Sequence, residues 1–272
     1  MLELNKIYNM DCLEGLKLID DDSIDLTITS PPYDNLRTYN GFSFDFESIA
    51  KELYRVTKQG GVVVWIVNDS TINGSETGTS FKQALFFKEI GFNIHDTMIY
   101  AKNNAMPLNH NRYDPCFEYM FILSKGKPKS FNPIKEKTLN EGKITKRELE
   151  IKMKNEIKHQ SRCREEHTVI KSTKFKKNIW YYSVGIEVDK KVNKHPAIFP
   201  EQLANDHILS WSNENDIVMD IFMGSGTTAK MAFLNNRDYI GFEISKEYCD
   251  IANKRIDYLL RQSTIFTDFE SL

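Results

Sequence analysis

The chain has 272 residues, of which 40% are hydrophobic and 12% aromatic, and its formal net charge is −2. This composition excludes a wholly disordered chain and favours one large domain or one domain with an insertion. No apolar run approaches the roughly 18 residues of a membrane helix, and the first residues do not resemble a signal peptide.

The cysteines and histidines give no sign of a metal centre or of disulfides. Cys12, Cys116, Cys163 and Cys249 lie far apart and form no CxxC pair. The six histidines show no metal-ligand spacing, so His195 is not expected to hold a metal. Reduced cysteines are typical of a reducing compartment, and we expect a cytoplasmic protein that needs no metal and no membrane.

The small net charge hides two parts of opposite sign. Residues 125–194 contain 20 Lys and Arg residues against 9 Asp and Glu residues, a net charge of +11, whereas the rest of the chain carries −13. A basic segment inside an acidic body is typical of an insertion that binds a polyanion. A lysine-rich solvated helix has the same composition, so charge alone leaves both interpretations open.

Residues 1–124 alternate between strand and helix patterns. We expect strands at 23–30, 62–67, 94–102 and 117–124, and helices at 46–57 and 80–91. Pro31-Pro32 ends the first strand, and Gly60-Gly61 ends the first helix. The run 62–67 is apolar without alternation, as in a strand covered on both faces. This half predicts an α/β domain with a mostly parallel sheet, in which the last two strands can pair antiparallel.

Residues 125–194 break this pattern, because lysine and glutamate dominate and large apolar residues become rare. The composition of 139–157 is helical, so we expect a basic and partly helical insertion. The α/β pattern resumes over 195–261, with helices expected at 200–211, 227–235 and 247–261 and strands at 217–222 and 239–243. We expect 262–272 to be a loose tail.

A glycine-rich turn follows the expected strand at 217–222. The sequence Asp220-Ile-Phe-Met-Gly224-Ser-Gly226-Thr-Thr228 places two glycines between a strand and a helix start. Glycines let backbone approach a ligand closely, and a helix N-terminus offers unpaired N–H groups. Glu243 follows 17 residues after Gly226, at the end of the next strand, which suits a carboxylate that binds ribose hydroxyls. This constellation predicts a nucleoside site.

A second constellation, Thr29-Ser30-Pro31-Pro32-Tyr33, lies where the first expected strand ends. Ligands of open parallel sheets bind just beyond the carboxyl ends of the strands. The prolines remove two backbone donors and leave carbonyl acceptors, Ser30 adds a hydroxyl, and Tyr33 adds a flat face. Together these groups suit a planar base that carries an amino group.

These two motifs resemble those of the DNA amino-methyltransferases, which methylate an exocyclic nitrogen of adenine or cytosine. Ser30-Pro-Pro-Tyr33 is similar to their catalytic motif (D/N/S)PP(Y/F/W), and residues 220–228 are similar to their cofactor motif DPFxGSGTT, with Ile221 in place of proline. The catalytic motif comes first, which is the circularly permuted order of the β group of this family. The resemblance covers about residues 5–125 and 195–258.

The resemblance implies a Rossmann-like, class I methyltransferase fold with a mostly parallel seven-stranded sheet, and S-adenosylmethionine as the cofactor. It makes 1–124 the catalytic half, 125–194 the target-recognition insertion and 195–261 the cofactor-binding half. The implied catalytic residues are Ser30, Pro31, Pro32 and Tyr33. The implied cofactor-binding residues are Asp11, Cys12, His195, Pro196, Phe199, Asp220, Phe222, Gly224, Ser225, Gly226, Thr227 and Glu243. Asp11 also suits a helix N-cap, and Trp65 is expected to be a core residue.

The basic insertion is expected to bind the phosphate backbone of duplex DNA and to include the target-recognition segment. The residues that we expect to contact DNA are Arg37, Tyr39, Arg162, Arg164, Lys174, Lys176 and Lys177. A cognate restriction endonuclease and a second copy of the chain are the other expected partners, since members of this group are often dimers.

Three functional interpretations remain open at the level of sequence. Serine at the first motif position slightly favours cytosine N4 over adenine N6 as the target. An RNA or protein-glutamine methyltransferase is a second possibility, although motifs there usually begin with asparagine. A non-catalytic DNA-binding module is the third, and the intact motifs at Ser30–Tyr33 and Gly224–Gly226 argue against it.

Overall fold

The computed structural model describes residues 2–32, 44–105, 111–151, 162–183 and 200–270; the side chains of 145–151, 162–168 and 262–270 are not described. The chain divides into two compact units. Unit 1 comprises Met1–Asn132 and Asn178–Leu272, and unit 2 comprises Pro133–Lys177. Each unit is described by itself below.

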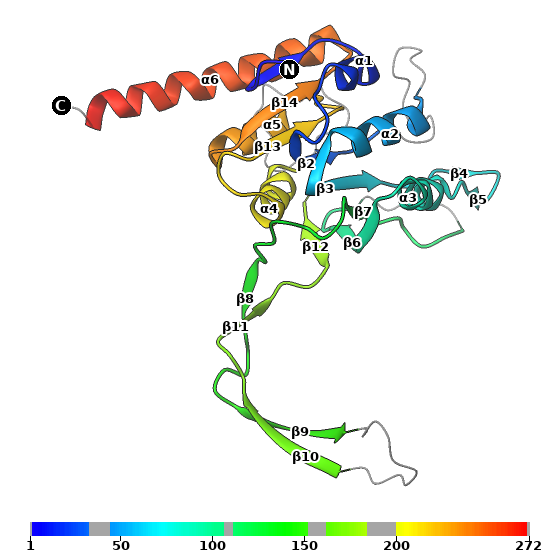
Figure 1. The fold of residues 1–272 in the computed structure, drawn as a ribbon, viewed down its shortest axis with the longest axis vertical. Helices are drawn as coiled ribbons and strands as arrows, with labels where there is room; N and C mark the ends of the chain where they lie inside the picture. Colours follow the sequence, from blue (N-terminus) through cyan, green and yellow to red (C-terminus); the bar gives the residue numbers. More distant parts are fainter. Residues whose placement is uncertain (1, 33–43, 106–110, 152–161, 184–199, 271–272) are drawn as a thin grey trace. The chain divides into compact units, whose positions relative to one another are not determined.

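An eight-stranded sheet forms the centre of unit 1, in the order β1-β14-β13-β2-β3-β7-β6-β12 (Figure 1). All neighbouring pairs are parallel except the two made by β7, which runs antiparallel to both β3 and β6. The strands are β1 (Lys6–Tyr8), β2 (Ile24–Thr29), β3 (Thr57–Val67), β6 (Asn93–Lys102), β7 (Phe117–Ser124), β12 (Ile179–Tyr182), β13 (Ile217–Asp220) and β14 (Asp238–Phe242). A small hairpin of β4 (Thr71–Ile72) and β5 (Ser75–Glu76) follows β3.

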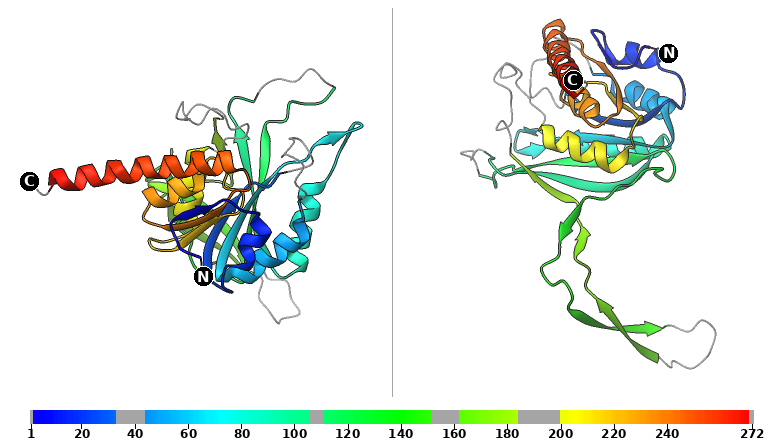
Figure 2. Two further views of the ribbon diagram at one scale, coloured as in Figure 1. Left: turned by 90° about the horizontal axis from the view of Figure 1, so that it is seen from above. Right: turned by 90° about the vertical axis from the view of Figure 1, so that its left-hand side faces the viewer.

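Helices cover both faces of this sheet (Figure 2). One face carries α1 (Cys12–Lys17), α2 (Phe46–Val56) and α3 (Thr79–Glu89), and the other carries α4 (Glu201–Trp211), α5 (Thr227–Leu234) and α6 (Lys246–Glu270). Leu53, Phe87 and Trp65 are fully buried in the core on the first face. Trp65 donates its indole N–H to Gln83 Oε1 at 2.8 Å, so its polar atom is satisfied inside the core, as expected for a core residue.

Aspartate side chains cap the first two helices. Asp11 caps α1, because its Oδ1 accepts hydrogen bonds from the backbone N–H groups of Leu13 (2.8 Å) and Glu14 (3.3 Å). Asp45 caps α2 by accepting from Ser48 N at 3.2 Å. The N-cap role expected for Asp11 is therefore confirmed.

The α/β class and most expected elements are confirmed, with five local differences. The sheet has an eighth strand, β12, which the insertion contributes. The helix expected at 46–57 ends at Val56, and β3 continues through Gly60-Gly61. The strand expected at 217–222 ends at Asp220. Residues 262–270 continue α6 instead of forming a loose tail.

The fifth difference concerns 139–157, where the structure has strand β9 (Ile144–Ile151) instead of a helix. Strand β9 pairs antiparallel with β10 (Arg162–Val169), and β8 (Lys135–Lys137) pairs antiparallel with β11 (Thr173–Phe175). No helix occurs in the described residues 125–151 and 162–183. Long-range pairing overrides the helical propensity of Lys and Glu here, and composition does not report such pairing.

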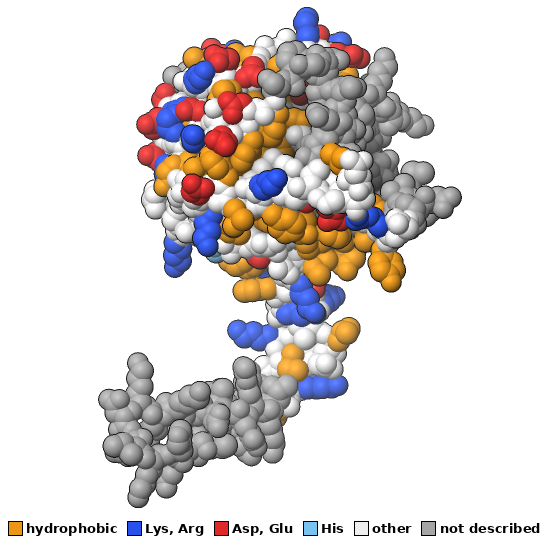
Figure 3. Space-filling view, turned by 90° about the vertical axis from the view of Figure 1, so that its right-hand side faces the viewer, with side chains coloured by type: hydrophobic (Ala, Val, Ile, Leu, Met, Phe, Trp, Pro, Cys, Tyr) orange, Lys and Arg blue, Asp and Glu red, His pale blue; other side chains and the backbone are white. Residues whose placement is uncertain are grey.

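Unit 2 has no buried residue among its described side chains, 133–144 and 169–177. Lysine side chains are prominent over this part, as the space-filling view shows in blue (Figure 3). A two-stranded ribbon without a core is marginally stable in water by itself. No helix among the described parts of the chain is long and apolar enough to span a membrane.

Candidate active site

The parallel strands of unit 1 bring four distant segments to one edge of the sheet. Strands β1, β14, β13, β2 and β3 are neighbours and run in the same direction, so their carboxyl ends share this edge. Asp11 follows β1, Glu243 follows β14, the glycine turn follows β13, and Ser30 follows β2. The two constellations found in the sequence are thus adjacent in the fold, which is where ligands bind in open α/β sheets.

The turn after β13 depends on its glycines. Gly224 and Gly226 have φ angles of 53° and 81°, in the left-handed region that glycine tolerates at no steric cost. A Cβ on Gly226 would lie 2.9 Å from the Cβ of Ala252 in α6, so a larger residue there has no room. Gly226 caps α5 without a side-chain hydrogen bond, which leaves the N-terminal N–H groups of α5 available to a polar ligand.

Glu243 lies beside this turn and is 9% exposed. Its Oε2 accepts from Gly224 N and its Oε1 from Ser245 N, both at 2.8 Å. Burial raises the pKa of this carboxyl, and the backbone hydrogen bonds partly oppose the rise. A carboxylate has about four lone-pair positions, so the two bonds leave Glu243 able to accept from a vicinal diol. The residues present therefore fit the ribose of a nucleoside cofactor.

Asp220, at the end of β13, is 7% exposed and accepts three hydrogen bonds. Oδ1 accepts from Thr29 Oγ1 at 2.7 Å and from Phe222 N at 3.0 Å, and Oδ2 accepts from Thr228 Oγ1 at 2.7 Å. Burial raises the pKa of its carboxyl to about 6, and these hydrogen bonds lower it in part. Asp220 therefore joins three parts of the site: the end of β2, the glycine turn and the start of α5.

The segment after β1 is fixed to the end of β14. Asn9 donates through Nδ2 to the carbonyl oxygens of Glu243 (2.9 Å) and Ile244 (3.0 Å), and Glu243 N donates to Tyr8 O at 3.0 Å. Asp11 follows this junction and is exposed. Cys12 is buried in the core, and burial raises the pKa of its thiol to about 12, so the thiol is protonated at neutral pH.

The catalytic segment begins with Ser30 and Pro32 half-buried and Pro31 buried. Tyr33, Arg37 and Tyr39 lie outside the described residues, as do His195, Pro196 and Phe199. Phe222 is half-buried. Its ring packs edge-on against that of Phe44, the first described residue after Pro32, with 5.7 Å between the ring centroids. Ser225 and Thr227 are buried within the turn and the first position of α5.

Several residues of this site were not found from the sequence. Thr29 and Thr228 belong to the two motifs, but only their contact with Asp220 gives them a role. Arg255, in α6, donates through Nη1 to Ser225 O at 3.0 Å and to Thr227 Oγ1 at 3.1 Å, and its Nη2 forms an ion pair with Glu201. Arg255 lies within a helical sequence pattern, and that pattern does not indicate that its side chain reaches the glycine turn.

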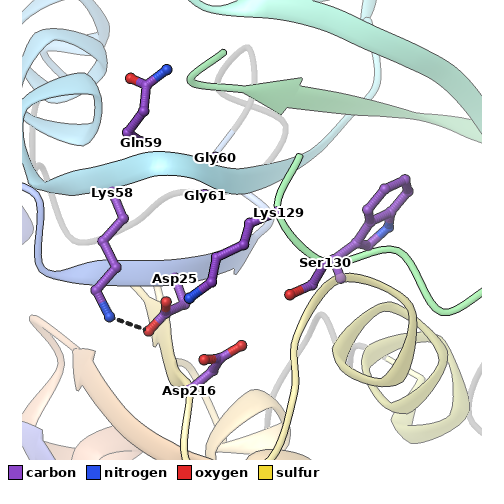
Figure 4. A pocket seen from close by; sticks show the side chains of 9 residues that line it. Asp25, Lys58, Gln59, Gly60, Gly61, Lys129, Ser130 and Asp216 are labelled. Atoms are coloured by element: carbon purple, nitrogen blue, oxygen red, sulfur yellow. Dashed lines mark hydrogen bonds and ion pairs between the residues drawn. The ribbon is translucent and has the colours of Figure 1, made fainter. Parts of the chain in front are cut away.

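A small pocket lies at the opposite edge of the sheet and is separate from this site (Figure 4). Lys58 Nζ and Asp25 Oδ2 form an ion pair of 2.6 Å there, and Ile217 N also donates to Asp25 Oδ2 at 3.0 Å. These bonds join the beginnings of β2, β3 and β13, so the pocket has a structural explanation. The described residues contain no cluster of three or more His, Cys, Asp or Glu residues that could hold a metal.

Comparison with known proteins agrees with this geometry. Residues 24–254 match the DNA methylase family of N6 and N4 methyltransferases. The orphan methyltransferase M.BamHII of Bacillus amyloliquefaciens is 58% identical over 244 residues, which are 88% of this chain and 90% of M.BamHII. The chain belongs to the N6/N4 DNA methylase family. It is therefore a DNA amino-methyltransferase that depends on S-adenosylmethionine, and the family resemblance of the two motifs is confirmed.

Solved structures place the fold in the same class. The cytosine-N4-specific PvuII DNA methyltransferase superposes with a TM-score of 0.67 at 21% identity, over 91% of this chain and 84% of that one. The M1.HpyAVI structure, a complex with S-adenosylmethionine, gives a TM-score of 0.57 at 26% identity, over 92% and 98% of the two chains. Family membership supports the DNA amino-methyltransferase interpretation among those that the sequence left open.

Proposed function

We propose that this methylase modifies the exocyclic amino group of a flipped base in duplex DNA, with cytosine N4 favoured over adenine N6. The observation that carries the proposal is the hydrogen bond of 2.7 Å from Thr29 to Asp220, which joins the start of the Ser30-Pro-Pro-Tyr33 segment to the glycine turn. A base held by the first segment then lies beside a cofactor held by the second.

The residues of the chain divide into two groups in this proposal. The glycine turn, the α5 N-terminus and Glu243 hold the nucleoside part of S-adenosylmethionine, and Asp11 accepts from its adenine amino group. The family resemblance assigns His195, Pro196 and Phe199 to the methionine end of the cofactor. When bound, S-adenosylmethionine would supply a methyl group on a sulfonium: the amino nitrogen of the base would form the new N–C bond as the S–C bond breaks, the sulfur would leave as a neutral thioether, and the methylated nitrogen would then lose a proton.

Ser30, Pro31 and Tyr33 position the target base. A base inside a duplex is out of reach and has to be flipped out, at a cost of a few kcal/mol. Stacking on Tyr33 returns roughly 1–3 kcal/mol. The Ser30 hydroxyl and the Pro31 carbonyl accept hydrogen bonds from the amino group, which localises the nitrogen lone pair that the ring otherwise withdraws. Much of the rate acceleration comes from this orientation.

The target base is tested by analysing the product. DNA incubated with the enzyme and labelled S-adenosylmethionine is digested to nucleosides, which are separated and identified by mass spectrometry. We expect label in N4-methylcytosine; label in N6-methyladenine alone would overturn the assignment of the base while leaving the reaction class intact. Single-molecule sequencing of the same DNA gives the recognition sequence.

We propose unit 2 as the element that contacts duplex DNA. Lys135, Lys137 and Lys174 are exposed on the β8–β11 ribbon, and Lys176 and Lys177 follow it. The β9–β10 ribbon carries Arg162 and Arg164, two positions apart in strand β10. The DNA major groove admits a two-stranded ribbon, and arginine forms bidentate hydrogen bonds with guanine.

A lysine substitution series tests this assignment. Replacing Lys174, Lys176 and Lys177 by Gln is expected to weaken DNA binding and to lower the slope of log K against log salt by up to about 2.7, since each phosphate contact contributes about 0.9. The matched control replaces Lys82, Lys88 and Lys254, which are exposed on α3 and α6, with the same change in net charge. Equal effects of the two triple variants would overturn the role of unit 2.

The remaining partners follow from the reaction. Methylation of a recognition sequence protects it from an endonuclease that cuts the same sequence, so a cognate restriction endonuclease is the expected companion, and action on DNA suits the cytoplasm. A homodimer is also expected. Digestion of methylated DNA with candidate endonucleases tests the expected endonuclease. Sedimentation equilibrium of the enzyme with and without DNA tests the expected homodimer.

A further inference from the structure

We propose that Thr29 is a positioning residue for methyl transfer: its hydroxyl, through Asp220, sets the position of Ser30, Pro31 and Pro32 relative to the glycine turn. Thr29 is 1% exposed and directly precedes Ser30. The inference rests on the proposed catalytic role of that segment and adds a residue that touches neither base nor cofactor in the proposed arrangement.

The backbone ladder holds Thr29 to β3, where it pairs with Trp65, but the ladder to β13 stops before Thr29. The parallel ladder between β2 and β13 pairs Leu26 with Val218 and Thr27 with Met219. Beyond these pairs, the side-chain bond from Thr29 Oγ1 to Asp220 Oδ1 connects the two strand ends at 2.7 Å. A hydrogen bond to a buried carboxylate is stronger than one between neutral groups and has a defined geometry, so it can fix the direction in which the chain leaves β2.

Asp220 also holds the glycine turn and the start of α5, which are expected to bind the cofactor. The same carboxylate accepts from Phe222 N in the glycine turn and from Thr228 Oγ1 in the first turn of α5. The two threonines that donate to Asp220 are buried, with Thr29 1% and Thr228 2% exposed. Asp220 thus orders the two halves of the site relative to each other, and Thr29 serves the catalytic half while Thr228 serves the cofactor half.

The strand offers a matched control for Thr29. Thr27 is two residues earlier on β2, is fully buried, and its hydroxyl has no hydrogen-bond partner among the described residues. Thr27→Val and Thr29→Val make the same isosteric change in the same strand. Only the second removes a bond to Asp220, so the difference between them isolates that bond from the general effect of valine at a buried position.

The experiment measures cofactor affinity and chemistry separately. Calorimetry gives the Kd of S-adenosylmethionine without DNA, and single-turnover methylation at saturating cofactor and DNA gives the rate of the transfer. We expect Thr29→Val to leave the Kd within about threefold and to lower the rate at least tenfold, because a displacement of about 1 Å can cost a hundredfold. Thr29→Ser keeps the hydroxyl and should restore the rate to within about threefold.

The controls distinguish this inference from the function on which it rests. Thr27→Val should transfer methyl groups as fast as wild type, and Thr228→Val should weaken cofactor binding. A Thr29→Val rate equal to that of wild type would overturn the positioning role, as would a loss of rate that Thr29→Ser does not restore. Failure of wild type to methylate any DNA would instead overturn the proposed function. Thermal unfolding of each variant shows that it is folded.

Discussion

Replacing Asp220 by Asn should make the protein more stable, and increasingly so as the pH rises. Asn has the shape of Asp; its Oδ1 can keep the hydrogen bonds from Thr29 and Phe222, and its amide can donate to the Thr228 hydroxyl in place of the bond that Oδ2 accepts. The variant removes the charge from a buried site that holds three neutral donors, and so relieves the cost of burying a carboxylate.

The magnitude follows from the pKa. Burial raises the pKa of the Asp220 carboxyl from 3.8 to about 6, which corresponds to a cost of about 3 kcal/mol when the group is fully ionised. The folded state binds the proton more tightly than the unfolded state. Stability from this group is therefore complete below pH 3.8 and is lost as the pH rises through 6. The loss is about 2 kcal/mol at pH 5 and about 3 kcal/mol at pH 8.

Urea denaturation at pH 5 and at pH 8 measures this effect. The stability of Asp220→Asn relative to wild type should increase by about 1 kcal/mol between the two pH values, because titrating groups that do not interact with Asp220 cancel in the difference. Asp250→Asn makes the same change at an exposed carboxylate on α6, where solvent screens the charge, and should show no such trend. If the free energies of unfolding of Asp220→Asn and wild type differed by the same amount at pH 5 and at pH 8, the reasoning would be refuted.

Four further outcomes follow from the site. Glu243→Ala should raise the Kd of S-adenosylmethionine at least tenfold, measured by calorimetry, because it removes the bond to Gly224 of the turn and the bond from Ser245 as well as the ribose acceptor; an unchanged Kd would contradict this. Tyr33→Ala should abolish methyl transfer with cofactor affinity within a few-fold of wild type, whereas Tyr33→Phe should keep most of the transfer if stacking is its role. Thr27→Val should raise the free energy of unfolding by about 1 kcal/mol, since it replaces a buried hydroxyl without a described partner by a methyl group. Arg255→Met should lower the free energy of unfolding by about 2–4 kcal/mol in urea, because it removes the bonds to the turn and a buried ion pair; a neutral effect would show that α6 does not support the turn.

The sequence predicted those parts of the fold whose signals are local. Apolar residues without alternation identified β3, near-helical spacing identified α2, and the proline pair located the end of β2. It was wrong about 139–157, because Lys and Glu favour a helix locally while the structure pairs Ile144–Ile151 with another strand. Pairing between strands depends on residues far apart in the chain, which periodicity within one window does not report.

The sequence by itself determined the reaction class that we predicted: Ser30-Pro-Pro-Tyr33 and the Asp220–Thr228 turn are the residues expected to form a base site and a nucleoside site, because each motif depends on neighbouring residues with defined backbone properties. The tertiary structure decided how the two sites are joined. Thr29 and Asp220 are 191 positions apart and meet only because β2 and β13 are neighbours in the sheet. Arg255 reaches Ser225 for a similar reason, since α6 packs against the start of α5. Contacts of this kind arise from the packing of whole elements, and no local pattern of residues encodes them.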